Sequence, residues 1–136
     1  MDKKVAQVYL AQYVGLKTEA DHMEQIADEE LKSVQQPRID ASKRKMAEIR
    51  KAVESIDDPL QRTVLHARYI DCRNGRLTTW PQIALQIYGS NTEAKMKATY
   101  RLHNKALEAL SVPVDPPSEP RGFLRSFFSR SSVKGN

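Results

Sequence analysis

A group of basic and amide side chains in the last third of the chain has residue types and spacing that suit a nucleic acid. Glu93, Lys97, Tyr100, Arg101 and Asn104 follow one another at steps of four, three, one and three, so a helix would carry them on one face. Lysine and arginine can contact phosphates or guanine edges, asparagine can pair with adenine, and tyrosine can do either or stack. The expected DNA-binding set adds two neighbouring lysines and consists of Lys95, Lys97, Tyr100, Arg101, Asn104 and Lys105.

Spacing alone fits an ordinary solvated helix face equally well, so the elements that position this helix matter. Ser90-Asn91-Thr92-Glu93 has capping-box spacing and opens a helix to about Leu110. Its core side is expected to carry Ala98, Leu102, Ala106 and Leu110, opposite the basic face.

A shorter helix is expected just before it. Thr79 and Gln82 form another capping box, and Gly89 marks the helix end. Ile83, Ala84 and Ile87 should face inward. A short helix, a glycine-marked turn and a longer capped helix together describe a helix-turn-helix, whose second helix enters the major groove. Trp80 is interpreted as a core anchor beside the capped turn rather than as a base-stacking residue.

A further helix should precede this pair. Asp58 is an expected N-cap with Pro59 in the first turn, and Leu60, Val64, Leu65 and Tyr69 should form its apolar face, up to about Ile70. Residues 71–76 then read as a turn-rich loop.

The charge is placed unevenly along the 136 residues. Residues 1–56 hold ten Lys and Arg against ten Asp and Glu, residues 57–111 hold eight against five, and residues 112–136 hold four against two, which gives 0, +3 and +2 and the total of +5. The excess lies wholly in the second half, which is therefore the expected polyanion-binding part.

Three segments also carry a family resemblance: IDDPLQRTVLHARYI, TWPQIALQIYGSN and ATYRLHNKALEAL. They resemble the phage late-transcription regulators of the ArpU/RinA type and the sigma-70 region 4 fold. The loop 71–79 and the stretch between Ser90 and Tyr100 are longer than in that pattern. The matching positions are Asp58, Pro59, Leu60, Arg62, Leu65, Arg68, Tyr69, Ile70, Trp80, Ile83, Ala84, Ser90, Tyr100, Arg101, Leu102, His103, Ala106, Leu107 and Leu110.

This resemblance implies a phage or prophage regulator that binds double-stranded DNA and activates transcription in the cytoplasm of a bacterial host. Contact with RNA polymerase would come from the N-terminal helices or from the C-terminal tail. Two other functions stay open. One is a small terminase subunit, which also joins a helix-turn-helix to a coiled coil. The other is an interaction protein that uses the sigma-like fold to bind polymerase or a host factor without reading DNA.

The N-terminal part predicts an antiparallel helical hairpin, with its turn at Gln36-Pro37-Arg38. The longer first helix would need a further partner, either the domain that follows or a second copy of the chain. One heptad seam runs through Tyr9, Tyr13, Leu16, Ala20, Met23 and Ala27 to Val34, with Glu30 as a polar member. The other seam consists of Ile39, Ser42, Met46, Ile49, Val53 and Ile56.

Other functions find little support in the sequence. The chain shows no Gly-rich phosphate loop, nucleophile elbow or paired-carboxylate motif, so neither an enzyme nor a cofactor is expected. His22, His66 and His103 are scattered and Cys72 is the one cysteine, so no metal site is expected. No apolar stretch is long enough to span a membrane, and the N-terminus lacks a signal-peptide core.

The C-terminal segment, residues 112–136, combines a linker containing four prolines with a basic tail. A disordered tail and a partner-docking motif are equally supported, because all three phenylalanines of the chain lie there. The fold class is thus all-α: a hairpin over residues 1–56, a sigma-region-4-like helix-turn-helix over 57–111, and this tail. The expected partner-binding residues are Phe123, Leu124, Phe127 and Phe128.

Overall fold

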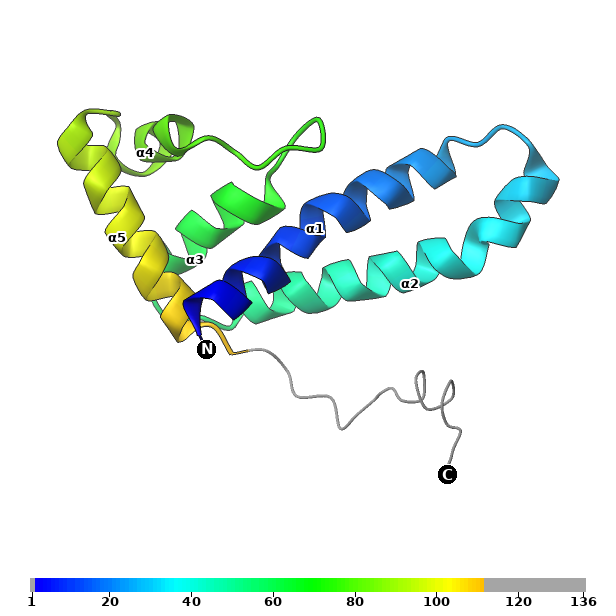
Figure 1. Ribbon diagram of the computed structural model, residues 1–136, viewed down its shortest axis with the longest axis horizontal. Coiled ribbons are helices and arrows are strands. Elements are labelled where there is room, and N and C mark those ends of the chain that lie inside the picture. The colour runs from blue at the N-terminus through cyan, green and yellow to red at the C-terminus, as the bar shows by residue number, and fades with distance from the viewer. Residues whose placement is uncertain (1, 112–136) are drawn as a thin grey trace, which may run out of the picture.

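The computed structural model describes residues 2–111, and these form an all-helical protein. In the described residues α1 (Lys3–Glu24) and α2 (Glu29–Glu54) make a long antiparallel hairpin, and four shorter elements follow at its open end (Figure 1). These are α3 (Pro59–Leu65), the π-helical turn η1 (His66–Ile70), α4 (Trp80–Tyr88) and α5 (Glu93–Ala109). The predictions for Phe123, Leu124, Phe127 and Phe128 lie outside the described residues.

The hairpin was predicted correctly, but the predicted turn was wrong. The chain reverses at residues 25–28, where the Asp28 carboxylate accepts from the backbone N–H of Glu30 (3.0 Å) and Leu31 (3.1 Å) and so caps α2. Pro37 lies inside α2 rather than at the turn. A proline within a helix removes one backbone hydrogen bond, and the ribbon of α2 changes direction in this part of the helix (Figure 1).

Ion pairs across the hairpin show why the reversal must come early. Arg38 lies opposite Glu19 (Nη2 to Oε2, 3.0 Å), and Lys43 lies opposite Glu24 (Nζ to Oε2, 2.6 Å). A turn at Pro37 could not bring Arg38 back to Glu19. With the reversal at 25–28 the two arms contain 22 and 26 residues, and their apolar faces pair along most of their length.

The two predicted seams had different outcomes. Every member of the second seam is buried or half-buried, including Ser42, which is 6% exposed. The first seam is correct from Tyr9 to Met23, but it fails beyond the true turn. Ala27 and Glu30 are exposed, and Val34 is 68% exposed, because these residues lie in the turn and in the first turns of α2.

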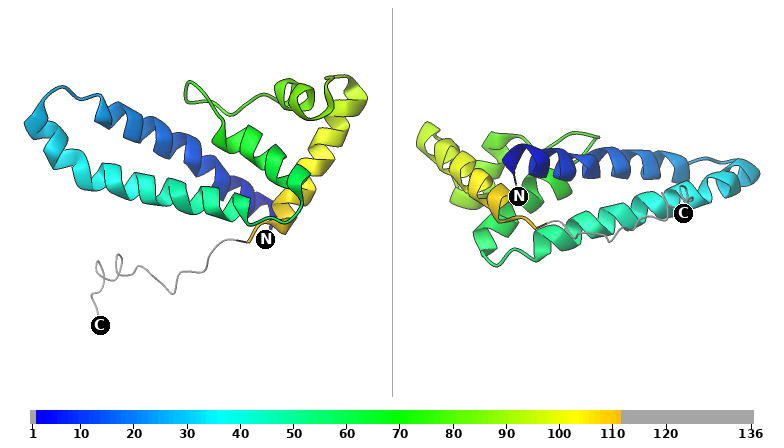
Figure 2. Two further views of the ribbon diagram at one scale, coloured as in Figure 1. Left: turned by 180° about the vertical axis from the view of Figure 1, so that it is seen from behind. Right: turned by 60° about the horizontal axis from the view of Figure 1, so that its bottom comes forward.

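The N-terminal turns of α1 do find a further partner, and it is the domain that follows. Ala6 and Leu10 are fully buried against η1 and α5 in one continuous core that also contains Ile49, Leu65 and Leu107. Figure 2 shows α1 and α5 meeting at the open end of the hairpin in both further views. The segments before and after residue 57, where the sequence suggested a domain boundary, therefore share one core.

The start of α3 follows the prediction closely. The Asp58 carboxylate accepts from the Leu60 N–H at 2.9 Å, and Pro59 occupies the first helical position. Val64, Leu65 and Tyr69 are buried as expected. Leu60 is an exception, since it is 50% exposed at the first turn.

Candidate nucleic-acid interface

The candidate interface is built on α4 and α5, which follow each other through a short turn. α4 ends at Gly89, whose φ of 76° is the left-handed conformation that glycine adopts without strain. The N-cap of α5 is Thr92, whose hydroxyl accepts from the Lys95 N–H at 3.3 Å. The predicted cap at Ser90 was thus two residues too early. The Lys95 ammonium lies 5.4 Å from the centre of the Tyr88 ring and joins the end of α4 to the start of α5.

The cap of α4 also differs from its prediction. Thr79 does precede the helix, but its hydroxyl donates to Oε1 of Gln82 (3.2 Å) instead of satisfying a backbone N–H. Ile83 and Ala84 are buried and Ile87 packs against the core, as the apolar pattern predicted. α4 therefore presents an apolar side to α5 and α3, and its surface side carries Gln82, Gln86 and Leu85, which is 48% exposed.

The buried stripe of α5 was predicted correctly at Ala106 and Leu110 but one residue out of register in its N-terminal half. Thr99 and His103 are buried, together with Ala106, Leu107 and Leu110. Ala98 and Leu102, which the sequence placed in the core, are only half-buried. The stripe was misread because its first two members are polar: the Thr99 hydroxyl is satisfied by donating to the Lys95 carbonyl (2.8 Å).

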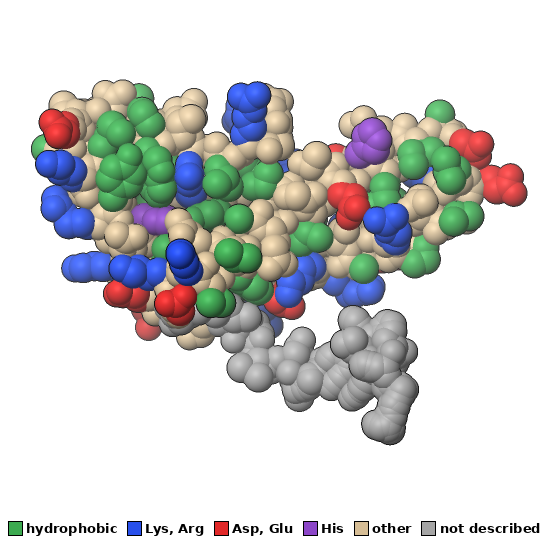
Figure 3. Space-filling view, viewed as in Figure 1, with side chains coloured by type: hydrophobic (Ala, Val, Ile, Leu, Met, Phe, Trp, Pro, Cys, Tyr) green, Lys and Arg blue, Asp and Glu red, His purple; other side chains and the backbone are tan. Residues whose placement is uncertain are grey.

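All six predicted DNA-binding residues are exposed, but they do not form one compact group. At about 100° per residue, Arg101 lies near the middle of the face opposite the buried stripe, with Lys97, Asn104 and Lys105 around it. Tyr100 and Lys95 lie on the two opposite borders of that face. Figure 3 shows Lys and Arg side chains gathered over α5, at the left end of the molecule.

Most of the positive charge on this face has no partner in residues 2–111. Arg101 and Lys105 form no ion pair there, and Lys97 makes a loose, exposed pair with Glu93 (Nζ to Oε2, 3.7 Å). Glu108 lies on the same side near the C-terminal end of α5, where Lys3 of α1 approaches it at 4.0 Å. The free cations are thus in the first four turns of the helix, ahead of Glu108.

An aromatic cluster behind α5 fixes its position; the sequence predicted core roles for its members Trp80 and Tyr69 but not for His103. The Trp80 ring meets Tyr100 edge-on at 4.9 Å and His103 at 4.8 Å. The Arg68 guanidinium of η1 lies 4.3 Å from the same ring. Nε2 of His103 and the Tyr69 hydroxyl share a buried hydrogen bond of 2.7 Å. These contacts tie η1, α4 and α5 together.

Apart from the Arg68 guanidinium, the side chains of the cluster are uncharged at neutral pH. Burial, helped by the nearby Arg68 charge, lowers the pKa of His103 to about 4, so its imidazole is neutral at pH 7. Burial raises the pKa of the Tyr69 hydroxyl, which therefore keeps its proton. Cys72 is likewise buried, and burial raises the pKa of its thiol, which disfavours the reactive thiolate. Within residues 2–111 no cluster of His, Cys, Asp or Glu could hold a metal ion.

Comparison with known proteins gives no match to this chain among family models, curated proteins or solved structures. The resemblance to phage late-transcription regulators therefore remains a prediction. Of the helices in the described part of the chain, none is both long enough and apolar enough to cross a membrane.

Proposed function

We propose that this protein binds double-stranded DNA with sequence preference and regulates transcription, with α5 as its recognition helix. One observation carries the proposal. α5 is a helix of 17 residues, held from behind by α1, α3 and α4 and by the Tyr69–His103 hydrogen bond, and its outward face carries unpaired cations and an amide. Such a face can enter a major groove without exposing apolar side chains.

The residues of this face would have different roles. Arg101, at its centre, can donate two hydrogen bonds to one guanine, and Asn104 can pair with adenine. Lys97 and Lys105 are placed to contact phosphates on either side. Lys95 and Tyr100 lie at the borders, where their contacts to Tyr88 and Trp80 would orient them toward the backbone rather than the bases.

The regulatory part of the proposal rests on the resemblance of residues 58–110 to phage late-gene activators. In this reading the protein acts on a phage or prophage promoter in the bacterial cytoplasm, and the hairpin is free to contact RNA polymerase or a second copy of the chain. The hairpin projects away from α5, so a partner on it would not compete with DNA (Figure 1).

The proposal is tested by sequencing fragments of genomic DNA that the full-length protein retains at moderate salt. Enrichment of one or a few sites near promoters is the expected result. Arg101→Ala should lose that enrichment, while Arg44→Ala, which removes an exposed arginine of α2, should keep it.

Two other results would overturn the proposal in different directions. Binding that requires a ring-shaped oligomer and enriches a packaging region would identify a small terminase subunit. A folded protein that retains no DNA even at low salt would identify an interaction protein.

A further inference from the structure

The long loop between η1 and α4 contains a tight hairpin turn. Asn74 and Gly75 have φ values of 56° and 69°, the pair of left-handed conformations of a type I′ turn. Arg73 and Arg76 flank them as an antiparallel bridge, and the Arg76 N–H donates to the Arg73 carbonyl at 3.0 Å. The turn therefore places two arginines directly opposite each other.

The body of the protein holds this turn at its base. There the Thr78 N–H donates to the Arg68 carbonyl (3.3 Å), and Nη1 of Arg68 donates to the Thr78 carbonyl (2.6 Å). The tip lies beside α1, where a Cβ added at Gly75 would be in ordinary van der Waals contact with the Thr18 hydroxyl oxygen, at 3.4 Å. The two arginines thus follow a base that is hydrogen-bonded to η1.

The two guanidinium groups have no ion pair or side-chain hydrogen bond within residues 2–111, and both residues are exposed. Like charges at directly opposite positions of a bridge destabilise it. Arg73 and Arg76 therefore repel each other in the free protein, and an anion beside them would remove that cost.

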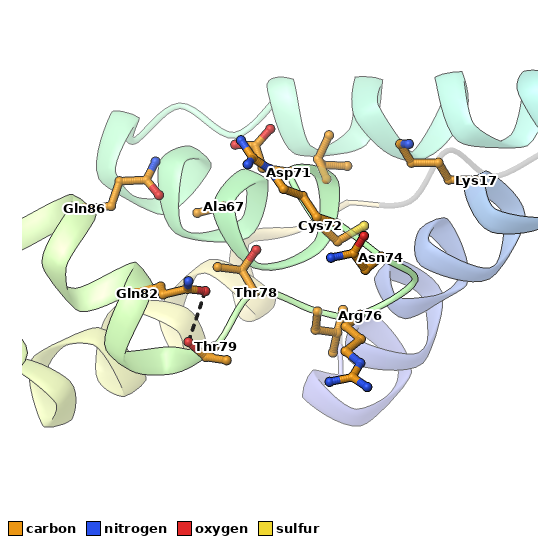
Figure 4. A pocket seen from close by; sticks show the side chains of 13 residues that line it. Lys17, Ala67, Asp71, Cys72, Asn74, Arg76, Thr78, Thr79, Gln82 and Gln86 are labelled. Carbon is orange, nitrogen blue, oxygen red and sulfur yellow. Dashed lines mark hydrogen bonds between the residues drawn. The ribbon is translucent and has the colours of Figure 1, made fainter. Parts of the chain in front are cut away.

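An open hollow of about 870 Å³ lies beside the pair and has the lining that an anion needs. Figure 4 shows its side chains coming from α1, the loop and α4, with Thr79, Gln82 and Gln86 supplying hydroxyl and amide groups. Of its other charged groups, Lys17 bonds to Asp21 (3.0 Å), and the Asp71 carboxylate lies 3.1 Å from Nδ1 of His66, which is charged only when protonated. The two arginines are the unpaired cations of the hollow.

The location of the hollow indicates the source of the anion. The loop, α4 and the start of α5 follow one another along the same edge of the molecule in all the ribbon views (Figures 1 and 2). A duplex contacted by the first turns of α5 and extending over α4 would present its backbone to the loop. We propose that Arg73, Arg76 and the adjoining hollow bind backbone phosphates of DNA, flanking the segment that α5 contacts. This inference rests on the proposed function.

The experiment compares two charge-matched variants of the full-length protein on the preferred duplex and on a random-sequence duplex, each of about 30 base pairs, roughly three helical turns. Arg73→Ala/Arg76→Ala removes the proposed site, and Arg44→Ala/Lys51→Ala removes two exposed, unpaired cations of α2. The slope of log affinity against log salt should be shallower by about two units for the first variant, since each phosphate contact contributes about one. It should be unchanged for the second.

The salt slope, the preference between sequences and the melting temperature distinguish failure of the phosphate site from failure of the proposed function and from a structural role of the arginines. If the loop variant keeps the wild-type slope while the wild type binds DNA, the phosphate site is wrong and the proposed function stands. If the loop variant selectively loses the preferred sequence, the arginines read bases and the phosphate assignment is also wrong. If the wild type shows no salt-dependent binding, the proposed function falls, and this inference with it. The melting temperature of the loop variant should equal or exceed that of the wild type, because the repulsion is gone; a clear decrease would show that the arginines have a structural role instead.

Discussion

The hairpin and the α5 end of this molecule contain similar numbers of cations but use them differently. Five of the ten Lys and Arg residues before position 57 form ion pairs, whereas one of the eight in residues 57–111, Lys97, does so. Two of these five pairs, Arg38–Glu19 and Lys43–Glu24, join α1 to α2. Two more lie within one helix, and Lys3 pairs with Glu108 of α5. Around α5 and the preceding loop the cations face solvent.

This difference in pairing indicates which cations are available to a ligand, which the net charges of the two halves do not. A lysine beside a carboxylate can attract a polyanion only after that contact is broken or shared, whereas an unpaired arginine on a fixed element can attract one at once. Arg38 and Lys43 of the hairpin therefore help to hold the register of α1 against α2. The cations near α5 remain available to a ligand, and we infer that the ligand is DNA.

The largest expected effect concerns whether the two regions fold as one. Leu10 of α1 and Leu107 of α5 are fully buried in the same core. Leu10→Ala and Leu107→Ala should each destabilise the protein by about 2–5 kcal/mol and shift a single transition in chemical denaturation. The exposed Val8→Ala serves as the control and should change stability by less than about 0.5 kcal/mol. Two separate transitions, with Leu10→Ala shifting only one, would show that the hairpin folds independently.

The second expected effect is a loss of stability in acid that originates near α5. The pKa of His103 in the folded protein, about 4, is below the value of 6.5 for an unperturbed histidine. The unfolded chain then binds more protons between these values, so stability is complete above about pH 6.5 and falls as the pH drops toward 4. The loss could reach roughly 3 kcal/mol, at about 1.4 kcal/mol per pKa unit.

His103→Gln tests this assignment, because an amide can still bond to the Tyr69 hydroxyl but does not titrate in this range. The variant should unfold with a flatter dependence on pH between 4 and 6.5, measured by urea denaturation. An unchanged pH dependence would assign the acid sensitivity to other groups.

The third effect separates two residues of the exposed face of α5. Arg101→Ala should cost about 1–3 kcal/mol on the preferred site and relax the preference at one base pair. Lys97→Ala should weaken all sequences about equally and reduce the salt slope by about one unit. Titration on preferred and scrambled duplexes measures both. Equal losses on both duplexes for Arg101→Ala would show that Arg101 contacts only phosphates.

The smallest expected effect belongs to the hairpin ion pairs. The Lys43–Glu24 pair is exposed, and such pairs contribute at most about 1 kcal/mol. Glu24→Gln should therefore lower the melting temperature only slightly, less so at high salt, and leave DNA affinity unchanged. A tenfold change in DNA affinity would mean that the hairpin takes part in binding.

The sequence predicted best where apolar spacing and capping agree. The seam from Ile39 to Ile56 and the cap at Asp58 are confirmed in the structure. The prediction was wrong where one strong local signal outweighed weaker ones. Pro37 suggested a turn, but Asp28 caps α2, and the ion pairs across the hairpin require an earlier reversal. Propensity cannot show such pairs, because they join residues far apart in the chain.

Within the candidate site, the exposed positions of α5 follow from helical spacing, but its buried stripe does not. Thr99 and His103 are polar, and their burial depends on hydrogen bonds that only the folded structure reveals. The arginine pair of the loop could have been found, because an Asn-Gly dipeptide flanked by Arg73 and Arg76 is a type I′ turn signal. The position of that turn beside Thr18 could not, since it depends on how α1 packs.

The most direct test of the account measures how salt affects the affinity of the full-length protein for duplex DNA when two cations are removed from either region. Lys97→Ala/Arg101→Ala should weaken binding and reduce the salt slope by about one to two units, because each side chain that neutralises a phosphate contributes about one. Arg44→Ala/Lys51→Ala, with the same change in net charge, should leave both affinity and slope as in the wild type. Equal effects of the two variants, with both proteins folded, would contradict the account, because binding would then follow total charge rather than the face of α5.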